Sequence, residues 1–467
     1  MGASAGLRRA AAAAALIVLL PPAAHAFIAA TTRIRPPHVV LPEPGATRSW
    51  TRIRGGLREV YLQGSPEAIG ASESRLLRDR MIADEARLWS DYELFVPFWI
   101  ARAGIQDLSR IRYRHVDRGI PEARRRELAA QSLAFEPDPF TPRMPTYHRM
   151  VFLHALYDIA LSFEHSPLIG CSTFAIGPAM TRDGHVIVAR TFDMETDDAL
   201  DRDKAVFLVR EDGSIPFASV AWPGFVGVVT GMNVEGVFIV VHGGRAGEPR
   251  AEGMPVAFSL RQVLERAHDT EEAVAILRAQ EVMVSHIVFV ADGSGQFAIV
   301  ERAPGVPAYV HEAAGSATVT NAFEGPLAGD PKNLKVLSTT TSVARAERIQ
   351  ELLARLAPHT GSAQTALGIL RDHGCAGDDR CELGDRRAID ALIATHGVVA
   401  DATARVLWVS TGPHLAGKFA RVDLRALFAP DHDWSTDPES EAMPEDPILR
   451  DGRYEKATKH QTRAEVR

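Results

Sequence analysis

Residues 170–193 read GCSTFAIGPAMTRDGHVIVARTFD, and this stretch decides the fold. Two apolar runs rich in β-branched residues flank Arg182-Asp183-Gly184, a turn signal typical of a β-hairpin. Pairing residues 171–181 with residues 185–193 returns the end of the second strand to the start of the first. The pattern therefore predicts that Arg190 and Asp193 lie beside Cys171.

Helical and alternating patterns continue on both sides of this hairpin. Before it, a proline-spaced extended segment at 27–50 precedes apolar residues at helical spacing over 72–104, 121–135 and 147–163. After it we expect strands at 205–210, 217–233, 236–242, 286–291, 296–301, 308–311, 317–319 and 405–410, and helices at 259–280, 342–356, 363–370 and 386–394. Consecutive strands interspersed with helices indicate an α+β fold in which helices cover sheets.

The two ends of the chain differ in composition from its middle. Arg8 and Arg9, the apolar run 10–20 and Ala24-His25-Ala26 predict a signal peptide over residues 1–26, cleaved after Ala26. The run is too short to span a bilayer, so we expect a secreted or periplasmic protein without a membrane span. The acidic, proline-broken residues 429–467 predict a disordered tail.

Charge and motifs exclude several classes of function. The 467 residues carry a formal net charge of −7, and loss of the signal peptide makes it more negative, which disfavours nucleic-acid binding. Residues 412–418 have the spacing of a phosphate-binding loop, but Phe419 stands where a magnesium-binding hydroxyl is needed. The histidines are scattered, and no pattern predicts a metal or a cofactor.

The three cysteines separate into a pair and a single residue. Cys375 and Cys381 enclose a short polar loop that allows a disulfide. Cys171 is left over, and either a reactive thiol or a buried small apolar residue is compatible with the sequence alone.

A thiol at Cys171 would need activation, because only the thiolate is a good nucleophile. The Arg190 guanidinium would lower the thiol pKa, and Asp193 would orient an amine that accepts the proton. No histidine has papain-like spacing. If the Gly170–Cys171 peptide bond is cut, however, the new α-amino group of Cys171 becomes a general base on the same residue.

These residues carry a family resemblance. Cys171-Ser-Thr-Phe-Ala, Thr181-x-Asp-Gly184 and Arg190-x-x-Asp193 resemble the cysteine N-terminal-nucleophile (Ntn) hydrolases, the group of penicillin acyltransferase, choloylglycine hydrolase, penicillin V acylase and acid ceramidase. Weaker similarity extends over roughly 57–425, at residues 62–70, Gly231-Met-Asn233-x-x-Gly236, Thr320-Asn321 and Ser342-x-x-Arg345-x-x-Arg348. Ser74 departs from the pattern, where the pro-segment of this group usually has glycine.

The resemblance implies a four-layer αββα sandwich and a precursor that cuts itself before Cys171. A helical pro-segment over 27–170 would become the α chain, and residues 171–428 would form the catalytic region of the β chain. No cofactor is implied. The substrate would be a small-molecule N-acyl amide, hydrolysed or used for acyl transfer through a cysteine thioester.

The site residues implied by the resemblance are Cys171, Arg190, Asp193, Asn321 and Arg345. Cys171 would be nucleophile and, through its amine, base, while Arg190 and Asp193 tune and orient it. Asn321 would donate to the oxyanion, and Arg345, rather than Arg348, would complete the charge network. Related hydrolases can have asparagine or tyrosine where this chain has Gly243, so the second oxyanion donor is open between the Gly243 amide and His242.

Two other interpretations remain. One is a non-catalytic secreted binding protein that keeps the fold around an inert Cys171. The other, ranked last, is a metal-dependent hydrolase that uses histidines.

Overall fold

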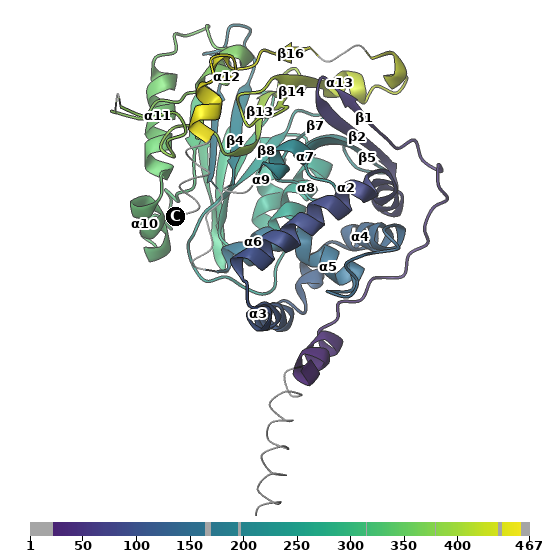
Figure 1. Ribbon diagram of the computed structural model, residues 1–467. Coiled ribbons are helices and arrows are strands. Elements are labelled where there is room, and N and C mark those ends of the chain that lie inside the picture. The colour runs from purple at the N-terminus through teal and green to yellow at the C-terminus, as the bar shows by residue number, and fades with distance from the viewer. Residues whose placement is uncertain are drawn as a thin grey trace, which may run out of the picture.

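The computed structural model describes residues 22–163, 170–194, 198–313, 315–378, 380–437 and 441–458. Its strands form two sheets (Figure 1). The larger has the order β1 (Trp50–Arg54), β2 (Leu57–Gly64), β5 (Ala205–Glu211), β6 (Phe217–Ala221), β7 (Thr230–Asn233), β8 (Phe238–Gly243), β9 (His286–Ala291), β10 (Phe297–Ala303) and β11 (Val306–Ala313). The smaller has the order β12 (Ser316–Val319), β3 (Gly170–Ile176), β4 (Ile187–Asp193), β13 (Ala394–Asp401), β14 (Val406–Ser410), β15 (Phe419–Asp423) and β16 (Ala442–Met443).

The two sheets pack face to face, and alternation along β5 shows how. Val206 and Leu208 belong to the apolar cluster shared with the smaller sheet, whereas Phe207 and Val209 face the cluster on the other side. Helices α8 (Val256–Arg266) and α9 (Thr270–Ala279) cover this outer side of the larger sheet.

The outer face of the smaller sheet is covered in the same way. Phe174 of β3 and Ala189 of β4 share an apolar cluster with α11 (Ser342–Ala354) and α12 (Ala363–Leu370). In Figure 1 these two helices lie on the side of the molecule away from α8 and α9. The result is the expected α+β sandwich with the layer order αββα.

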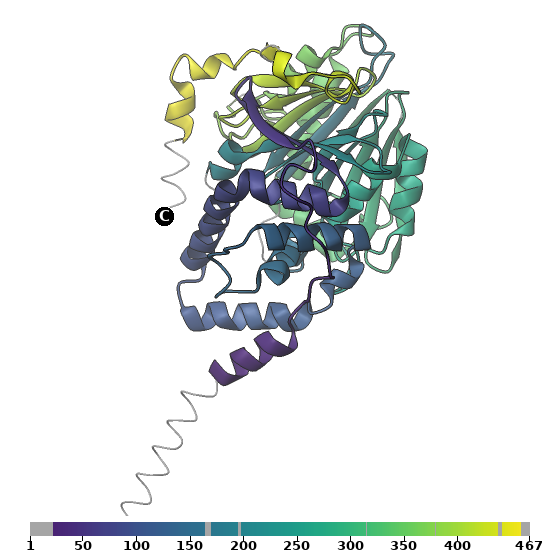
Figure 2. The ribbon, with the colours of Figure 1, turned by 90° about the vertical axis from the view of Figure 1, so that its right-hand side faces the viewer.

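The region before Cys171 contributes helices and strands. Its helices are α2 (Pro66–Phe95), α3 (Trp99–Arg112), α4 (Glu122–Ala134), α5 (Thr146–His154) and α6 (Leu156–Leu161), and Figure 2 shows them gathered below the strands. The helix α2 starts where the sequence favours it, since the Ser65 side chain accepts a hydrogen bond from the Ala68 amide and Pro66 follows.

The region 27–170, predicted as a helical pro-segment, also contains strands that the sequence analysis does not predict. These strands are β1 and β2, and β2 pairs in parallel with β5, with Arg58 opposite Ala205 and Gly64 opposite Glu211. The reason is the apolar run at Val60, Tyr61 and Leu62, whose side chains are almost fully buried in the sheet. This region is therefore built into the larger sheet.

The predicted helix at 386–394 is wrong. These residues form turns, and from Ala394 the chain enters β13, which pairs with β4 so that Val398 lies opposite Arg190. The glycine within β13 obscures the strand pattern. It is there because a Cβ on Gly397 would lie 2.2 Å from Leu415 Cδ2.

The C-terminal residues are another correction. In the described part of 429–467, β16 pairs with β15 through Phe419 and Met443. Ile448 is only 2% exposed, and the Trp434 ring lies 4.7 Å from the Tyr61 ring. These apolar side chains anchor an otherwise acidic segment, so 429–437 and 441–449 are part of the fold rather than a disordered tail.

Several predicted segments divide into two elements. Residues 217–233 form β6 and β7, 259–280 fall in α8 and α9, and 147–163 fall in α5 and α6. The remaining elements are short: η1 (Val116–Gly119), α7 (Ala199–Asp203), α10 (Pro331–Thr339), α13 (Leu424–Leu427), η2 (Trp434–Thr436) and η3 (Pro447–Leu449).

The charged and apolar parts of the predicted signal peptide lie outside the described residues. Residues 22–31 are helical and include Ala26, and His25 hydrogen-bonds Asp107 of α3 at 3.0 Å. Among the helices of the described ranges, none combines the length and the hydropathy that crossing a bilayer requires.

Candidate active site

One end of the space between the sheets is polar. Inward-facing positions on β3 run from Ala175 through Thr173 to Cys171, and on β4 from Val188 to Arg190, so apolar residues give way to polar ones. The same change occurs on three further strands, at Thr230, His242 and His396, all fully buried. Polar residues that interrupt a buried alternating pattern cost stability unless they are paired, which marks this end as the candidate site.

The hairpin places Arg190 against the thiol as the sequence predicts. Cys171 pairs with Phe192 and Thr173 with Arg190, so Arg190 is diagonal to Cys171. Its Nη2 lies 3.5 Å from Cys171 Sγ. The guanidinium is fixed by donating to the backbone carbonyls of Val229 and Val241, at 3.0 and 2.8 Å.

The positive charge of Arg190 is available to stabilise a thiolate at Cys171. No carboxylate within the described ranges forms an ion pair with this buried guanidinium, whose Cζ lies 4.6 Å from the centre of the Phe192 ring. Burial raises the pKa of the Cys171 thiol, and the charge of Arg190 is the largest influence in the opposite direction. The contact with Arg190 thus favours the thiolate of Cys171, whereas burial alone would favour the protonated thiol.

Arg345 and Asn321 hold the backbone of the nucleophile. Arg345 Nη1 donates to the Cys171 carbonyl at 2.6 Å and to Ser172 Oγ at 2.7 Å, and its Nη2 donates to Asn321 Oδ1 at 2.9 Å. The Cys171 amide donates to the same Asn321 oxygen at 3.0 Å. Both residues reach Cys171 from distant parts of the chain, Asn321 from just after β12 and Arg345 from α11.

The amide nitrogen of Asn321 has a partner too. Nδ2 donates to the Gly243 carbonyl at 2.9 Å, so in this continuous chain it is engaged rather than directed at an empty position. Its predicted role as an oxyanion donor stays a prediction. Because residue 243 is a glycine, it supplies no side-chain donor to the oxyanion.

Asp193 lies next to the bond predicted to be cut. It pairs with Gly170 across the hairpin, and a Cβ on Gly170 would lie 3.2 Å from Asp193 Cβ. Thr191 Oγ1 donates to its carboxylate at 2.9 Å. Burial raises the pKa of Asp193 to about 6, an effect that the charge of Arg345 reduces.

Two histidines flank this arrangement, and sequence reasoning considers only one of them. His242 Nε2 lies 2.9 Å from Thr173 Oγ1. His396 Nε2 lies 2.9 Å from Thr230 Oγ1 and 3.4 Å from Arg190 Nη1. Burial, followed by the charge of Arg190, lowers the pKa of both imidazoles well below the usual value, which keeps them neutral.

A signal for the missed residue is present in the sequence. His396 stands two residues before Val398 and four before Ala400, in step with an inward-facing series. Thr230 precedes Met232 in the same way. Recognising β13 as a strand would bring His396 into the candidate set.

Arg348 lies away from the thiol. It donates to both carboxylate oxygens of Asp372, at 2.7 and 2.9 Å, and to Glu351 at 3.1 Å. The structure therefore brings Arg345, and not Arg348, to Cys171.

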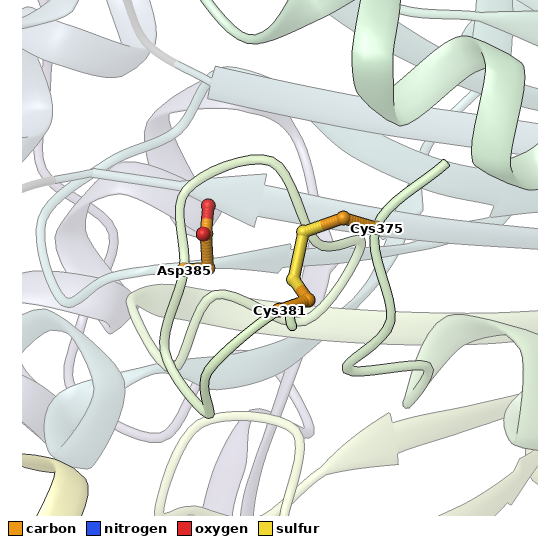
Figure 3. Close-up of side chains that lie close together, drawn as sticks. All are labelled: Cys375, Cys381 and Asp385. Carbon is orange, nitrogen blue, oxygen red and sulfur yellow. A yellow bond between two sulfur atoms is a disulfide. The ribbon is translucent and has the colours of Figure 1, made fainter. Parts of the chain in front are cut away.

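The other cysteines form a disulfide in the loop that follows α12. Figure 3 shows Cys375 bonded to Cys381, with the Asp385 side chain nearby. A separate group of side chains that could bind a metal ion consists of Asp183, His185 and Asp401. Within it, His185 Nδ1 lies 2.7 Å from Asp401. It sits at the turn end of the β3–β4 hairpin, opposite the end that holds Cys171.

Comparison with known proteins gives one family and several partial likenesses. The family model "Acyl-coenzyme A:6-aminopenicillanic acid acyl-transferase" matches residues 180–374, a segment that contains Arg190, Asp193, Asn321 and Arg345 and starts after Cys171. A curated relative, an uncharacterized protein of Archaeoglobus fulgidus, is 28% identical over 151 residues, which is 31% of this chain. The chain spans only 25% of that relative's length.

Three solved structures show a likeness. The Caenorhabditis elegans orthologue of N-acylethanolamine-hydrolyzing acid amidase is 15% identical, with 50% of this chain and 93% of that one covered and a TM-score of 0.37. Penicillin V acylase from Agrobacterium tumefaciens is 18% identical, with coverages of 54% and 86% and a TM-score of 0.37. A variant of conjugated bile acid hydrolase from Clostridium perfringens is 11% identical, with coverages of 59% and 98% and a TM-score of 0.40.

These scores are low, so the fold assignment rests on the two packed sheets and their helical layers. The family match covers the second strand of the hairpin, Asn321 and Arg345, and it ends before His396. Over residues 180–374 the chain is therefore similar to the acyl-coenzyme A:6-aminopenicillanic acid acyl-transferase family.

Proposed function

We propose that this protein is an exported, self-processing amidohydrolase that cleaves a small-molecule acyl amide through a thioester on Cys171. The observation that carries the proposal is the 3.5 Å contact between Arg190 Nη2 and Cys171 Sγ. A buried guanidinium with no carboxylate partner among the described residues is costly, and the cost is explained if its counter-charge is a thiolate.

The first reaction is scission of the chain itself. Cys171 Sγ attacks the Gly170 carbonyl carbon, the peptide bond to the Cys171 nitrogen breaks, and that nitrogen takes the thiol proton. Water then hydrolyses the resulting thioester, leaving a Gly170 carboxylate, a free thiol and a free α-amine. Arg345 and Asn321 support this step because they fix the carbonyl and the amide of Cys171 on the far side of the scissile bond.

The second reaction repeats this chemistry on a substrate. The α-amine of Cys171 accepts the thiol proton as Sγ attacks the acyl-amide carbonyl, and it returns the proton to the departing amine. Water resolves the thioester to a carboxylic acid. Asp193 is placed to orient the ammonium form of the amine, since it already lies beside Gly170.

Hydrolysis is favoured over transfer because an extracytoplasmic compartment lacks a ready supply of acyl-CoA. Export itself rests on the predicted signal peptide at residues 1–26. The family name supports chemistry at an acyl-amide bond and leaves the acyl group and the amine open.

Intact-mass analysis of the purified protein tests scission. We expect one fragment ending at Gly170 and a second beginning at Cys171, whereas Cys171→Ala gives one uncut chain without amidase activity. Cys375→Ser/Cys381→Ser is the matched control and retains scission and activity. A wild-type chain that stays uncut, with a thiol that no N-acyl substrate acylates, would support the non-catalytic binding protein instead.

A further inference from the structure

The turn between α2 and α3 exposes a group of large apolar side chains. Leu94 and Phe95 end α2, Phe98 precedes α3, and Trp99 and Ile100 begin it. These five residues are between 65% and 81% exposed. A soluble protein seldom leaves neighbouring large apolar side chains in water, and where it does they usually contact a partner or a membrane.

Helix α3 extends this apolar surface. Ile105, Leu108 and Ile111, each three residues from the next, are exposed along one face of the helix. Arg110 is the buried residue of α3, and its Nη2 donates to the Arg143 carbonyl at 2.9 Å. The usual arrangement of a surface helix is therefore reversed, because a charged side chain faces the protein and apolar side chains face away from it.

Hydrogen bonds fix the turn that carries the aromatic side chains. Arg102 Nη1 donates to the carbonyls of Val96 and Pro97, at 2.7 and 3.0 Å. The hydroxyl of Tyr92 donates to the Arg102 carbonyl at 3.2 Å, which ties the last turn of α2 to the first turn of α3. The apolar side chains are thus held in an exposed position by the fold itself.

The same helix is basic, although the chain as a whole is acidic. Residues 99–114 contain four arginines and one aspartate, whereas the formal net charge of the chain is −7. Arg112 and Arg114 are exposed, and neither forms an ion pair within the part of the chain that the structure describes. The one acid, Asp107, is hydrogen-bonded to His25 at 3.0 Å. The apolar surface is therefore accompanied by uncompensated positive charge.

The position of α3 relates this surface to the N-terminal segment. Figure 1 and Figure 2 both show α3 at the end of the molecule away from the strands, with the helix of residues 22–31 beside it. The contact between His25 and Asp107 joins the two helices. The apolar run 10–20 of the predicted signal peptide precedes residue 22, so a chain held in a membrane by that run would present α3 to the same membrane.

We infer that α3 and the turn before it form a docking surface for an anionic lipid bilayer. The helix lies along the bilayer, with Phe98, Trp99 and Leu108 at the boundary between headgroups and acyl chains and with Arg112 and Arg114 against lipid phosphates. Tryptophan suits this depth because its ring is amphipathic.

Charge favours a bilayer over a second copy of this chain as the occupant. Two copies joined through this face would bring their basic helices together, and like charges oppose such a contact. A negatively charged lipid surface complements both the arginines and the apolar side chains. The surface does not include Cys171, so the inference is independent of the proposed function.

Co-sedimentation of the full chain with lipid vesicles tests the inference. Wild type should bind vesicles of phosphatidylcholine with phosphatidylglycerol more tightly than vesicles of phosphatidylcholine alone. Phe98→Ser/Trp99→Ser should weaken binding to the mixed vesicles by about tenfold or more, because two large apolar side chains no longer enter the bilayer. Arg112→Gln/Arg114→Gln should remove most of the preference for phosphatidylglycerol.

Val306→Ser/Leu334→Ser is the matched control. Val306 on β11 and Leu334 on α10 are apolar residues with exposures of 40% and 51%, and this variant should bind like wild type. All the proteins carry the same N-terminus, so residues 1–21 contribute equally to each of them. Similar unfolding temperatures verify that the variants fold. Cys171→Ala should also bind like wild type, so a failure of the proposed amidase chemistry leaves this result unaffected.

Three outcomes would overturn the inference. The first is that wild type sediments with neither kind of vesicle, and the second is that Phe98→Ser/Trp99→Ser binds as tightly as wild type. The third is a self-association, seen by analytical ultracentrifugation, that Phe98→Ser/Trp99→Ser abolishes while vesicles bind neither protein. In that case the face joins two copies of the chain and does not contact lipid.

Discussion

Replacement of Arg190 by methionine gives the sharpest view of the candidate site, because the change removes the charge that faces the thiol. A unit charge 3.5 Å from a thiolate interacts by about 5 kcal/mol at an effective dielectric constant of about 20. A pKa difference of 1 corresponds to about 1.36 kcal/mol, so the upper limit of the effect on the thiol pKa is about 3.5. Opposite charges at this range usually change a pKa by about 1–3, and we expect the thiol pKa to rise by that amount.

The rise would be measured as the pH dependence of Cys171 alkylation by iodoacetamide, followed by mass spectrometry. At a pH below the pKa, the thiolate fraction falls about tenfold each time the pKa rises by 1, so alkylation at neutral pH should slow by about 10–1,000-fold. Cys375 and Cys381 are joined to each other and do not interfere. Arg190→Lys keeps the charge and should move the profile less than Arg190→Met.

Arg348→Met is the matched control. Arg348 is paired with Asp372 and Glu351 rather than with the sulfur, so the alkylation profile of this variant should overlay that of wild type. The variants are compared in the same processing state, which intact mass verifies. An unchanged profile in Arg190→Met, or an equal displacement in Arg348→Met, would refute the electrostatic account.

Three further outcomes follow from other features. Glu73 is buried, and burial raises its pKa from 4.5 to about 8. The folded state therefore binds this proton more tightly than the unfolded state, so the free energy of unfolding falls as pH rises from about 4.5 to about 8. In urea titrations, Glu73→Gln should flatten this dependence of the unfolding free energy on pH. Cys375→Ser/Cys381→Ser should lower the free energy of unfolding by about 2 kcal/mol, measured by denaturant titration, because the loop that the disulfide closes is short. Ile448→Ala should cost about 2–5 kcal/mol in the same measurement, whereas a truly disordered tail would show no change.

Local patterns in the sequence are enough to predict the hairpin, but they do not predict the rest of the candidate site. The turn at 182–184 and two alternating runs fix the pairing of Cys171 with Phe192, because a hairpin's register depends on neighbours in the chain. Asn321 and Arg345 contact Cys171 from 150 and 174 residues away. No local pattern encodes such contacts, and only the family resemblance suggests these two residues.

The errors have physical causes of the same kind. The pattern of β13 is weak because it contains a glycine, although close packing against Leu415 requires that glycine. The tail has the average composition of a disordered segment because it is acidic, while single apolar residues such as Met443 and Ile448 fasten it to the core. Average composition does not reveal isolated anchors, and a tertiary contact can reverse a local preference.

The parallel pairing of β2 with β5 has a consequence for the fate of the N-terminal piece. If the chain is cut before Cys171, the two products still share one continuous sheet, with β1 and β2 from the first and the remaining strands from the second. Releasing the first product would bare the backbone of β5 along its whole length. If the cut occurs, the N-terminal piece would therefore remain bound as a subunit rather than dissociate.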